Sequence, residues 1–549
     1  MLRRKSLVLA LLVTLSAGFI VGFWMPRDDD LFALRKNFEI FGSAYEELVT
    51  GYVKPVDPQH LMRVGLEAML DDLDPYTTFI DEAETSDINI ITRGRYGGVG
   101  LNVGRRGSKI TVLSPIEGAS GYKQGVRAGD IITRIGDRST EDLSLSDVRN
   151  LLRGEPGTTV DITVKREGES SPIRFTLTRE QVDLENVTYH GYLEAPSGVG
   201  YVKLERFARE AGAEVRSAIQ TLQSDGELRG LILDLRDNPG GLLEAAVDVS
   251  SLFVEQGSVI VSTRGRSPET ENVYRSQRAP LAPDLPLVVL VNGQSASASE
   301  IVAGAVQDLD RGIILGTTTF GKGLVQVVRS LPYNTSLKMT TAKYYTPSGR
   351  SIQSIDYDNG TATATPDSVG QTFTTEAGRT VRDLHGIEPD VTTMDRDVSE
   401  LEEALQRRAA FFFYANHFAA ETDSIAPTYS ATDATLSDFR TWLRDEGFSY
   451  RTDAALAVAE LEREFDTMGY SEVTDEIADL EQAVAAETEA DFQRHATTLK
   501  QHLQEEIWAR YLSKSAQIQR TLAYDPQVDE AARLLTTPDA YRDVLTPDP

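Results

Sequence analysis

The chain has 549 residues, and its 40% apolar and 25% charged residues are typical of a globular protein too long for one core. Its 84 acidic residues outnumber the 55 basic ones, and the resulting net charge of −29 repels nucleic acid phosphates. The sequence contains no cysteine, which excludes disulfides and thiolate chemistry, and its 6 histidines lack paired metal-ligand spacing. We therefore expect several domains, no nucleic-acid partner, no metal and no other cofactor.

The N-terminus begins MLRRK and continues with an apolar run from Ser6 to Trp24, about the length that crosses a bilayer core. The basic residues before this run predict a cytoplasmic start, with the rest of the chain on the extracytoplasmic, periplasmic side. Residues 1–30 therefore predict a membrane anchor. The alternative is a cleaved signal peptide and a secreted protein, although LSAGF at Leu15–Phe19 is a poor cleavage site.

Residues 31–92 alternate apolar and charged residues at helical spacing until Pro75 interrupts the pattern. Residues 93–180 then change to short β-rich runs separated by glycine, with one short helix in SLSDVRNLLRG. These patterns predict an N-terminal helical region followed by a small β-rich domain.

Residues 181–392 alternate buried strands such as LILDL and PLVVLV with amphipathic helices, which predicts an α/β core with a largely parallel sheet. Active sites in such sheets lie at the carboxyl ends of the strands. Residues 393–549 predict an acidic helical extension, whose apolar stripes pack on the body, on a second subunit or on an adaptor.

Two glycine-rich segments of the β-rich region, GGVGL at residues 97–101 and GVRAGDIITRIGDRS at residues 125–139, resemble a PDZ domain. In such domains the Gly-Φ-Gly-Φ loop presents N–H groups to the terminal carboxylate of a peptide, which adds as a strand to the sheet edge. Here the resemblance assigns that role to Gly98, Val99, Gly100 and Leu101. A plain glycine turn is the alternative for GGVG alone.

The run SASASE at residues 295–300 follows the buried strand PLVVLV and precedes an amphipathic helix. A serine at such a turn exposes its hydroxyl beside the free N–H groups of the helix start, which can stabilise an oxyanion. The alternative is that one serine only caps the helix.

A serine nucleophile requires a base, and no histidine lies in a suggestive context. Lys322 in TTTFGKGLVQ is the candidate, since apolar neighbours such as Phe320 and Leu324 favour its neutral form. Taken alone, a lysine between glycines is more often an ordinary loop residue.

These features together resemble the C-terminal processing peptidases, the tail-specific serine proteases with an embedded PDZ domain. The resemblance covers roughly residues 40–392 and is carried, in order, by DLRDNPGGLL, SASASEIVAGAVQD, TFGKGLVQ, YYTPSGRSIQ and GIEPDV. It implies an α/β catalytic core preceded by a β-rich PDZ domain, between an N-terminal helical segment and a C-terminal helical extension.

The resemblance also implies roles for individual residues. Ser297 is the expected nucleophile, Lys322 the expected general base, and Gln326 is expected to orient the lysine. Residues four apart on one strand share a face, so Gln326 could reach the Lys322 amine. The N–H groups of Gly241 and Ala298 are the expected oxyanion hole. Asp308 and Glu300 match acids of the family motif and are expected to support the site, Glu300 by capping the helix or by local hydrogen bonds.

The sequence therefore predicts a serine endopeptidase of the cell envelope that recognises apolar protein C-termini and needs no cofactor. Two rivals stay open: a catalytically silent PDZ scaffold, and a transmembrane structural protein whose helical tail does the binding. A homodimer or an adaptor complex through the helical regions is a further expectation.

Overall fold

The computed structural model describes residues 28–81, 94–358, 360–364, 370–383, 385–393, 398–470 and 473–547. By its internal contacts the chain divides into two compact units. One comprises Met1–Phe79 with Asp358–Thr361, and the other comprises Ile80–Tyr357 with Ala362–Pro549.

The smaller unit contains the helices α2 (Asp28–Gly51) and α3 (Pro58–Asp71), which the short strand β1 (Thr78–Ile80) follows in the sequence. Asp57 caps α3, because its carboxylate accepts hydrogen bonds from the N–H groups of Gln59 (2.9 Å) and His60 (3.4 Å). α2 exposes large apolar side chains, including Phe32 (71% exposed) and Phe38 (75% exposed).

The predicted membrane anchor, Ser6 to Trp24, lies outside the described residues. Among the helices that are described, none combines the length and the apolar character needed to cross a membrane.

The larger unit begins with a small β domain. Its elements are β2 (Arg95–Gly98), β3 (Leu101–Arg106), β4 (Lys109–Pro115), α5 (Ser120–Lys123), β5 (Ile131–Ile135), β6 (Arg138–Ser139), α6 (Leu145–Leu152), β7 (Thr159–Lys165), β8 (Ile173–Thr178) and β9 (Glu180–Asp183). The main sheet has the order β3-β4-β5-β7-β8 with β6 paired to β5, while β2 pairs with β9. β3 therefore lies at a sheet edge, and α6 packs beside it.

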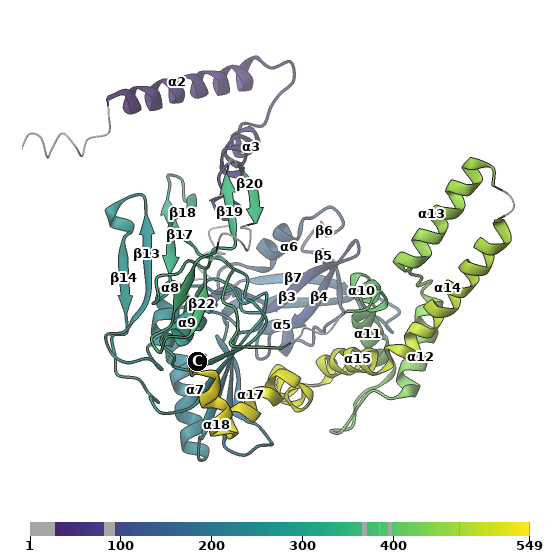
Figure 1. The fold of residues 1–549 in the computed structure, drawn as a ribbon. Coiled ribbons are helices and arrows are strands. Elements are labelled where there is room, and N and C mark those ends of the chain that lie inside the picture. The colour runs from purple at the N-terminus through teal and green to yellow at the C-terminus, as the bar shows by residue number, and fades with distance from the viewer. Residues whose placement is uncertain are drawn as a thin grey trace, which may run out of the picture. The chain divides into compact units, whose positions relative to one another are not determined.

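Residues 181–392, teal to green in Figure 1, contain a sheet with the order β10-β11-β12-β15-β16-β23, in which only β10 is antiparallel to its neighbour. Its strands and helices are β10 (Val187–Tyr192), β11 (Val199–Leu204), α7 (Ala211–Asp225), β12 (Gly230–Asp234), α8 (Leu243–Ser250), β15 (Leu287–Val291), α9 (Ala298–Asp308), β16 (Ile313–Gly316) and β23 (Val391–Thr392).

A second, antiparallel sheet contains β13 (Val259–Gly265), β14 (Asn272–Arg275), β17 (Leu324–Ser330) and β18 (Ser336–Tyr345). Four short strands follow: β19 (Ile355–Asp358), β20 (Thr361–Ala364), β21 (Thr372–Thr374) and β22 (Thr380–Arg382). The one-turn helix η1 (Pro268–Thr270) connects β13 to β14.

Alternate residues of the parallel strands pack into two different cores, so both faces of the sheet are buried. Leu231, Leu233 and Val289 face α7, α8 and α9, whereas Ile232 and Val288 belong to the opposite core. Strands buried on both faces have continuous apolar sequences, which explains LILDL and LVVLV.

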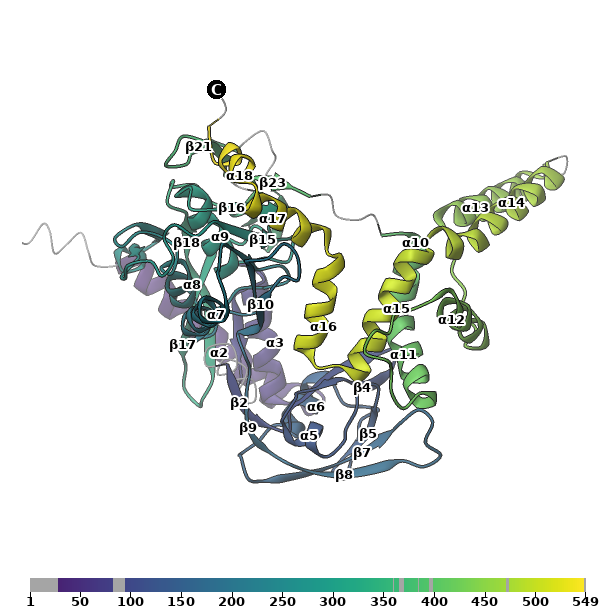
Figure 2. The same cartoon turned by 90° about the horizontal axis from the view of Figure 1, so that it is seen from below.

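The C-terminal helices cover that opposite face. They are α16 (Lys514–Thr521), η3 (Leu522–Tyr524), α17 (Pro526–Thr536) and α18 (Pro538–Val544), and α17 packs on β12, β15 and β16 (Figure 2). Val528, Ala531 and Leu534 are almost fully buried against the strands. This last segment is therefore the third layer of the core.

The helices between the core and this third layer form a separate cluster. They are α10 (Glu400–Arg407), α11 (Ala410–Glu421), α12 (Asp433–Asp445), α13 (Asp453–Met468), α14 (Thr474–Arg494) and α15 (Ala496–Tyr511). Leu405, Phe439 and Leu503 are fully buried at its centre. Phe411, Tyr414 and Phe418 of the run FFFYANHF pack there. The predicted fold class is thus confirmed.

Candidate active site

Ser297 lies at the turn between β15 and α9, immediately before the first residue of the helix. Its backbone has φ 55° and ψ −110°, which is a strained conformation for a residue with a side chain. All residues of α9 are buried, and Ser297 itself is half-buried. The turn therefore holds this hydroxyl-bearing residue at the rigid start of a helix.

The other two serines of the run fasten this turn to the chain after β12. The Ser295 hydroxyl donates to the Leu235 carbonyl (2.8 Å), and the Ser299 hydroxyl donates to the Asn238 carbonyl (2.9 Å). The Ala296 N–H donates to the same Asn238 carbonyl (3.1 Å). Both hydroxyls therefore hold the turn in place. Sequence reasoning had assigned no role to Ser295.

The NPGG turn approaches the serine turn most closely at Gly240, which has φ 96°. A Cβ there would lie 2.8 Å from the Ala298 nitrogen and 2.9 Å from Ser297 Cβ, so only glycine fits. Gly241 is held against Phe207, whose carbonyl oxygen would lie 2.3 Å from an added Cβ. The predicted oxyanion residues, Gly241 and Ala298, thus belong to two turns in direct contact.

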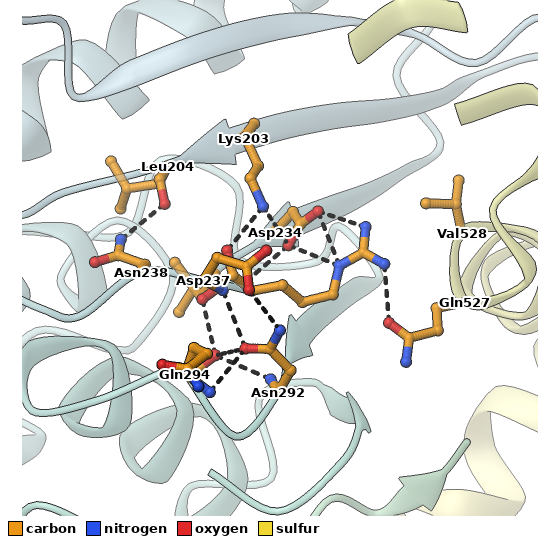
Figure 3. A network of polar contacts seen from close by, with 12 residues as sticks. Lys203, Leu204, Asp234, Asp237, Asn238, Asn292, Gln294, Gln527 and Val528 are labelled. Carbon is orange, nitrogen blue, oxygen red and sulfur yellow. Dashed lines mark hydrogen bonds and ion pairs between the residues drawn. The ribbon is translucent and has the colours of Figure 1, made fainter. Parts of the chain in front are cut away.

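Asp237 and Asn292 join the same two turns by a reciprocal pair of hydrogen bonds (Figure 3). The Asp237 N–H donates to Asn292 Oδ1 (3.0 Å), and Asn292 Nδ2 donates to Asp237 Oδ1 (2.9 Å). Asp237 also has a positive φ, 63°. Sequence reasoning missed this pair, although Asp237 lies within DLRDNPGGLL and Asn292 directly follows PLVVLV.

Glu300 is fully buried, and its carboxylate accepts four hydrogen bonds. The donors are the N–H groups of Ser297 (2.7 Å), Gly321 (2.7 Å) and Lys322 (2.9 Å) and the Thr319 hydroxyl (2.7 Å). Burial raises the pKa of the Glu300 carboxyl, and these hydrogen bonds oppose that rise. Glu300 therefore ties the main chain of Ser297 to that of Lys322.

Tyr344 on β18 makes a second connection between the same two residues. Its hydroxyl lies within hydrogen-bonding distance of the Ser297 carbonyl (3.1 Å) and donates to the Lys322 carbonyl. The Tyr344 side chain is 2% exposed. Sequence reasoning gave this tyrosine no role, since its motif carries no signal for it.

Lys322 lies before β17, which begins at Leu324. The premise that residues 322 and 326 lie on one strand is therefore wrong. Where β17 pairs with β18, Val325 lies opposite Ala342 and Gln326 opposite Thr340, so the extra residue at this register shift is on β18. The Gln326 amide donates to Thr340 Oγ1 (3.3 Å) on β18. Both Lys322 and Gln326 are half-buried.

Asp308 is the last residue of α9, about 16 Å along the helix axis from Ser297. Its carboxylate pairs with the fully buried Arg350 (2.8 Å) and accepts from the Ser348 N–H (3.0 Å). Asp308 therefore anchors the turn of the YYTPSGRSIQ motif to α9 and lies away from the serine.

A buried ion cluster connects the carboxyl end of β12 to α17. Figure 3 shows Asp234 and Lys203 of this cluster, with Gln527 of α17 nearby. Asp234 is fully buried and pairs with Arg236 (2.6 Å) and Lys203 (3.2 Å), while Arg236 pairs with Asp525 (2.8 Å) at the start of α17. Burial alone would raise the pKa of Asp234, but the charges of Arg236 and Lys203 outweigh it and hold this pKa well below its usual range.

The predicted peptide-binding loop lines a cavity of about 360 Å³ in the β domain. Val99, Gly100 and Leu101 contribute to its wall, and Gly98 lies just before them in a bridge with Arg153. Gly100 has φ 69°, a conformation that favours glycine.

Within the ranges that the structure describes, no three histidine, aspartate or glutamate side chains are grouped so that they could hold a metal ion.

Comparison with known proteins gives three family matches along the chain. Residues 111–166 match the PDZ domain, residues 198–367 match peptidase family S41, and residues 401–535 match the probable PDZ-protease C-terminal helical domain. A core of peptidase family S41 preceded by a PDZ domain defines a PDZ-containing serine protease.

A carboxy-terminal-processing protease of Bartonella bacilliformis is 37% identical over 355 residues, which cover 64% of this chain and 81% of the relative. A probable CtpA-like serine protease of Staphylococcus aureus is 29% identical over 391 residues, 69% of this chain and 77% of the relative. The structure of the photosystem II D1 C-terminal processing protease is 30% identical, with a TM-score of 0.37, over 63% of this chain and 85% of that one.

The chain belongs to the carboxy-terminal-processing proteases of peptidase family S41. It is a serine protease with a PDZ domain, and the family resemblance read from the sequence motifs is confirmed.

Proposed function

We propose that Ser297 is the nucleophile and Lys322 the general base of this protease. The observation that carries the proposal is the double connection of their main chains, by the Glu300 carboxylate on one side and the Tyr344 hydroxyl on the other. A nucleophile and its base must keep one relative position through the reaction.

In the proposed mechanism neutral Lys322 takes the Ser297 proton as Oγ attacks the peptide carbonyl. The N–H groups of Gly241 and Ala298 stabilise the tetrahedral oxyanion; Ala298 starts α9, so its N–H has no partner within the helix. The lysine then gives its proton to the leaving amine, and water hydrolyses the acyl-enzyme by the reverse sequence. Gln326 orients Lys322 in the substrate complex.

The PDZ groove is proposed to capture the C-terminus of the substrate, with the terminal carboxylate at the loop from Gly98 to Leu101. The cavity beside that loop and the unpaired edge of β3, which in the described residues pairs only with β4, support this assignment. Movement of this domain would gate the site.

We further propose that residues 6–24 anchor the protein in the membrane with the protease outside the cytoplasm. The apolar sequence and the preceding basic residues support this orientation. The exposed apolar side chains of α2 support a homodimer through the N-terminal helices, and an adaptor on these helices is the alternative.

The test incubates the purified protein with an unfolded protein that ends in apolar residues, across a pH series. We expect cleavage by the wild type and none by Ser297→Ala. Lys322→Arg should also be inactive while remaining folded, because arginine is not deprotonated at working pH. Lys338→Arg, a half-buried lysine on β18, is the matched control and should retain activity.

If wild type and Ser297→Ala leave the substrate equally intact, the chain acts as a PDZ scaffold in this assay and the assignment of Ser297 fails. Turnover by Lys322→Arg would mean that another group is the base.

A further inference from the structure

The cavity of the PDZ domain has an apolar floor and a charged rim. It lies between the β3 edge and α6, and Val103, Ile116 and Leu152 are among the apolar residues that line it. An apolar terminal side chain fits such a floor.

All the charged side chains that line this cavity are arginines: Arg149 on α6, Arg153 after it, and Arg206 after β11. No aspartate or glutamate is among the lining residues. The chain as a whole has a net charge of −29, whereas the charged side chains that line this groove are all positive.

Among the described residues, two of these arginines have no partner of opposite charge. Within the part of the chain that the structure describes, the guanidinium groups of Arg149 and Arg206 make no ion pair and no hydrogen bond. Arg149 is exposed, and Arg206 is half-buried. Arg153 instead lies over the Tyr96 ring, 5.6 Å from its centroid. Arg149 and Arg206 are therefore available to a ligand in the groove.

We propose that Arg149 and Arg206 select protein C-termini that carry an acidic side chain shortly before an apolar terminal residue. This inference rests on the proposed capture of C-termini by the groove. The Gly98–Leu101 loop takes the terminal carboxylate, and the two guanidinium groups take the second negative charge. The selection acts locally, because charges are screened beyond about 8 Å at physiological salt.

The test measures binding of labelled peptides to the full-length Ser297→Ala protein by fluorescence anisotropy. The peptides share an apolar terminal residue and carry Glu, Gln or Lys at each of the three preceding positions in turn. We expect the best Glu peptide to bind about threefold to tenfold more tightly than its Gln counterpart, with Lys weakest, and the ratio should shrink at high salt.

Replacing both arginines, by Arg149→Gln with Arg206→Gln, should bring the Glu-to-Gln ratio to about one while the Gln peptide binds as before. Arg138→Gln, an exposed arginine of the same domain outside the cavity, is the matched control and should keep the ratio. The charge reversal Arg206→Glu should favour the Lys peptide.

A wild-type ratio near one, or a ratio that survives the double substitution, overturns the inference and leaves capture of C-termini intact. The same peptides with an amidated C-terminus test that capture separately. If amidation does not weaken binding, or if no peptide binds, the proposed role of the loop fails and the selection by the arginines fails with it.

Discussion

Glu300 is the residue on which the geometry of the serine turn depends most directly. A carboxylate has no donor of its own, so its two oxygens can face the three N–H groups and one hydroxyl that surround it. The role expected from the sequence, capping of α9 by Glu300, accounts only for the hydrogen bond from the Ser297 N–H. The other bonds reach the loop that carries Lys322.

The substitution Glu300→Gln should disrupt this arrangement, because an amide NH2 would face N–H donors. We expect kcat to fall by roughly a hundredfold, as small displacements of reacting groups do, and the folded protein to persist. Steady-state cleavage assays and circular dichroism check this. Glu255→Gln, at an exposed position, should change neither; an active Glu300→Gln enzyme would contradict the positioning role.

Asp234 carries a prediction about stability rather than catalysis. Asp234→Asn removes the buried negative charge that Lys203 and Arg236 share, while Arg236 keeps its pair with Asp525. We expect a loss of about 3–5 kcal/mol in the free energy of unfolding. Denaturant unfolding measures it. Glu227→Gln, which removes an exposed pair with Arg229, is the control and should have little effect.

The pH dependence of this contribution follows from the lowered pKa of Asp234. The stabilisation is fully present above the unfolded pKa of aspartate, about 3.9, and is lost as the pH falls through the lower folded pKa. The difference in stability between wild type and Asp234→Asn should therefore be constant from pH 8 to about 5 and shrink only below about pH 4. A difference that already shrinks near pH 6 would contradict the assignment.

At the scale of elements, the two turns after β12 and β15 form one rigid assembly. Gly240 fits between Ala296 and Ala298, and the Asp237–Asn292 pair fastens the edges. Asp237 and Ser297 both have strained, positive φ values. The surrounding hydrogen bonds and contacts hold both residues in these conformations.

Gly240→Ala tests the close approach of the turns. The added methyl would lie 2.6 Å from the Ala296 oxygen, so the turns must separate and activity should fall below detection. Gly257→Ala is a matched control, because Gly257 has a similar φ of 93° with no atom within 4 Å of an added Cβ. Both variants should lose about 1 kcal/mol of stability from backbone strain, but Gly257→Ala should cleave normally in the same assay.

At the scale of the whole molecule, the last helices are the least expected part of the core. The sequence predicts one helical extension with several partners open, whereas the structure shows α16–α18 covering the sheet and α10–α15 forming their own core. Tyr541 on α18 even bonds through its hydroxyl to the main chain of Leu287 at the start of β15.

A chain that ends at Ser513 should therefore expose the sheet face around Tyr201, Ile232 and Val288. We expect it to aggregate or to bind a hydrophobic dye, as assayed by sedimentation and fluorescence. A chain that ends at Leu545, past the last helix, should remain soluble and active. A soluble, active product from the shorter chain would show that the third layer is dispensable.

Most of the architecture could be predicted from sequence because its signals are local. The periodicity of the apolar residues and the positions of the glycines identified the β domain and the α/β core. The order of the motifs identified the family. Contacts between distant segments have no such signal. Nothing near Tyr344 indicates its bond to Ser297, and the sequence of β18 does not reveal its extra residue, Thr341, opposite β17.

The class of protein, the serine turn and a lysine that could act as its base were all predictable from the sequence, because strand and helix periodicities and short motifs depend on neighbouring residues. The tertiary structure decided which groups hold that turn, with Glu300, Tyr344 and Gly240 drawn from three separate segments. It also decided what covers the sheet. The physical reason is that burial and hydrogen bonding act between residues close in space, and only the folded chain brings residues 232 and 531 together.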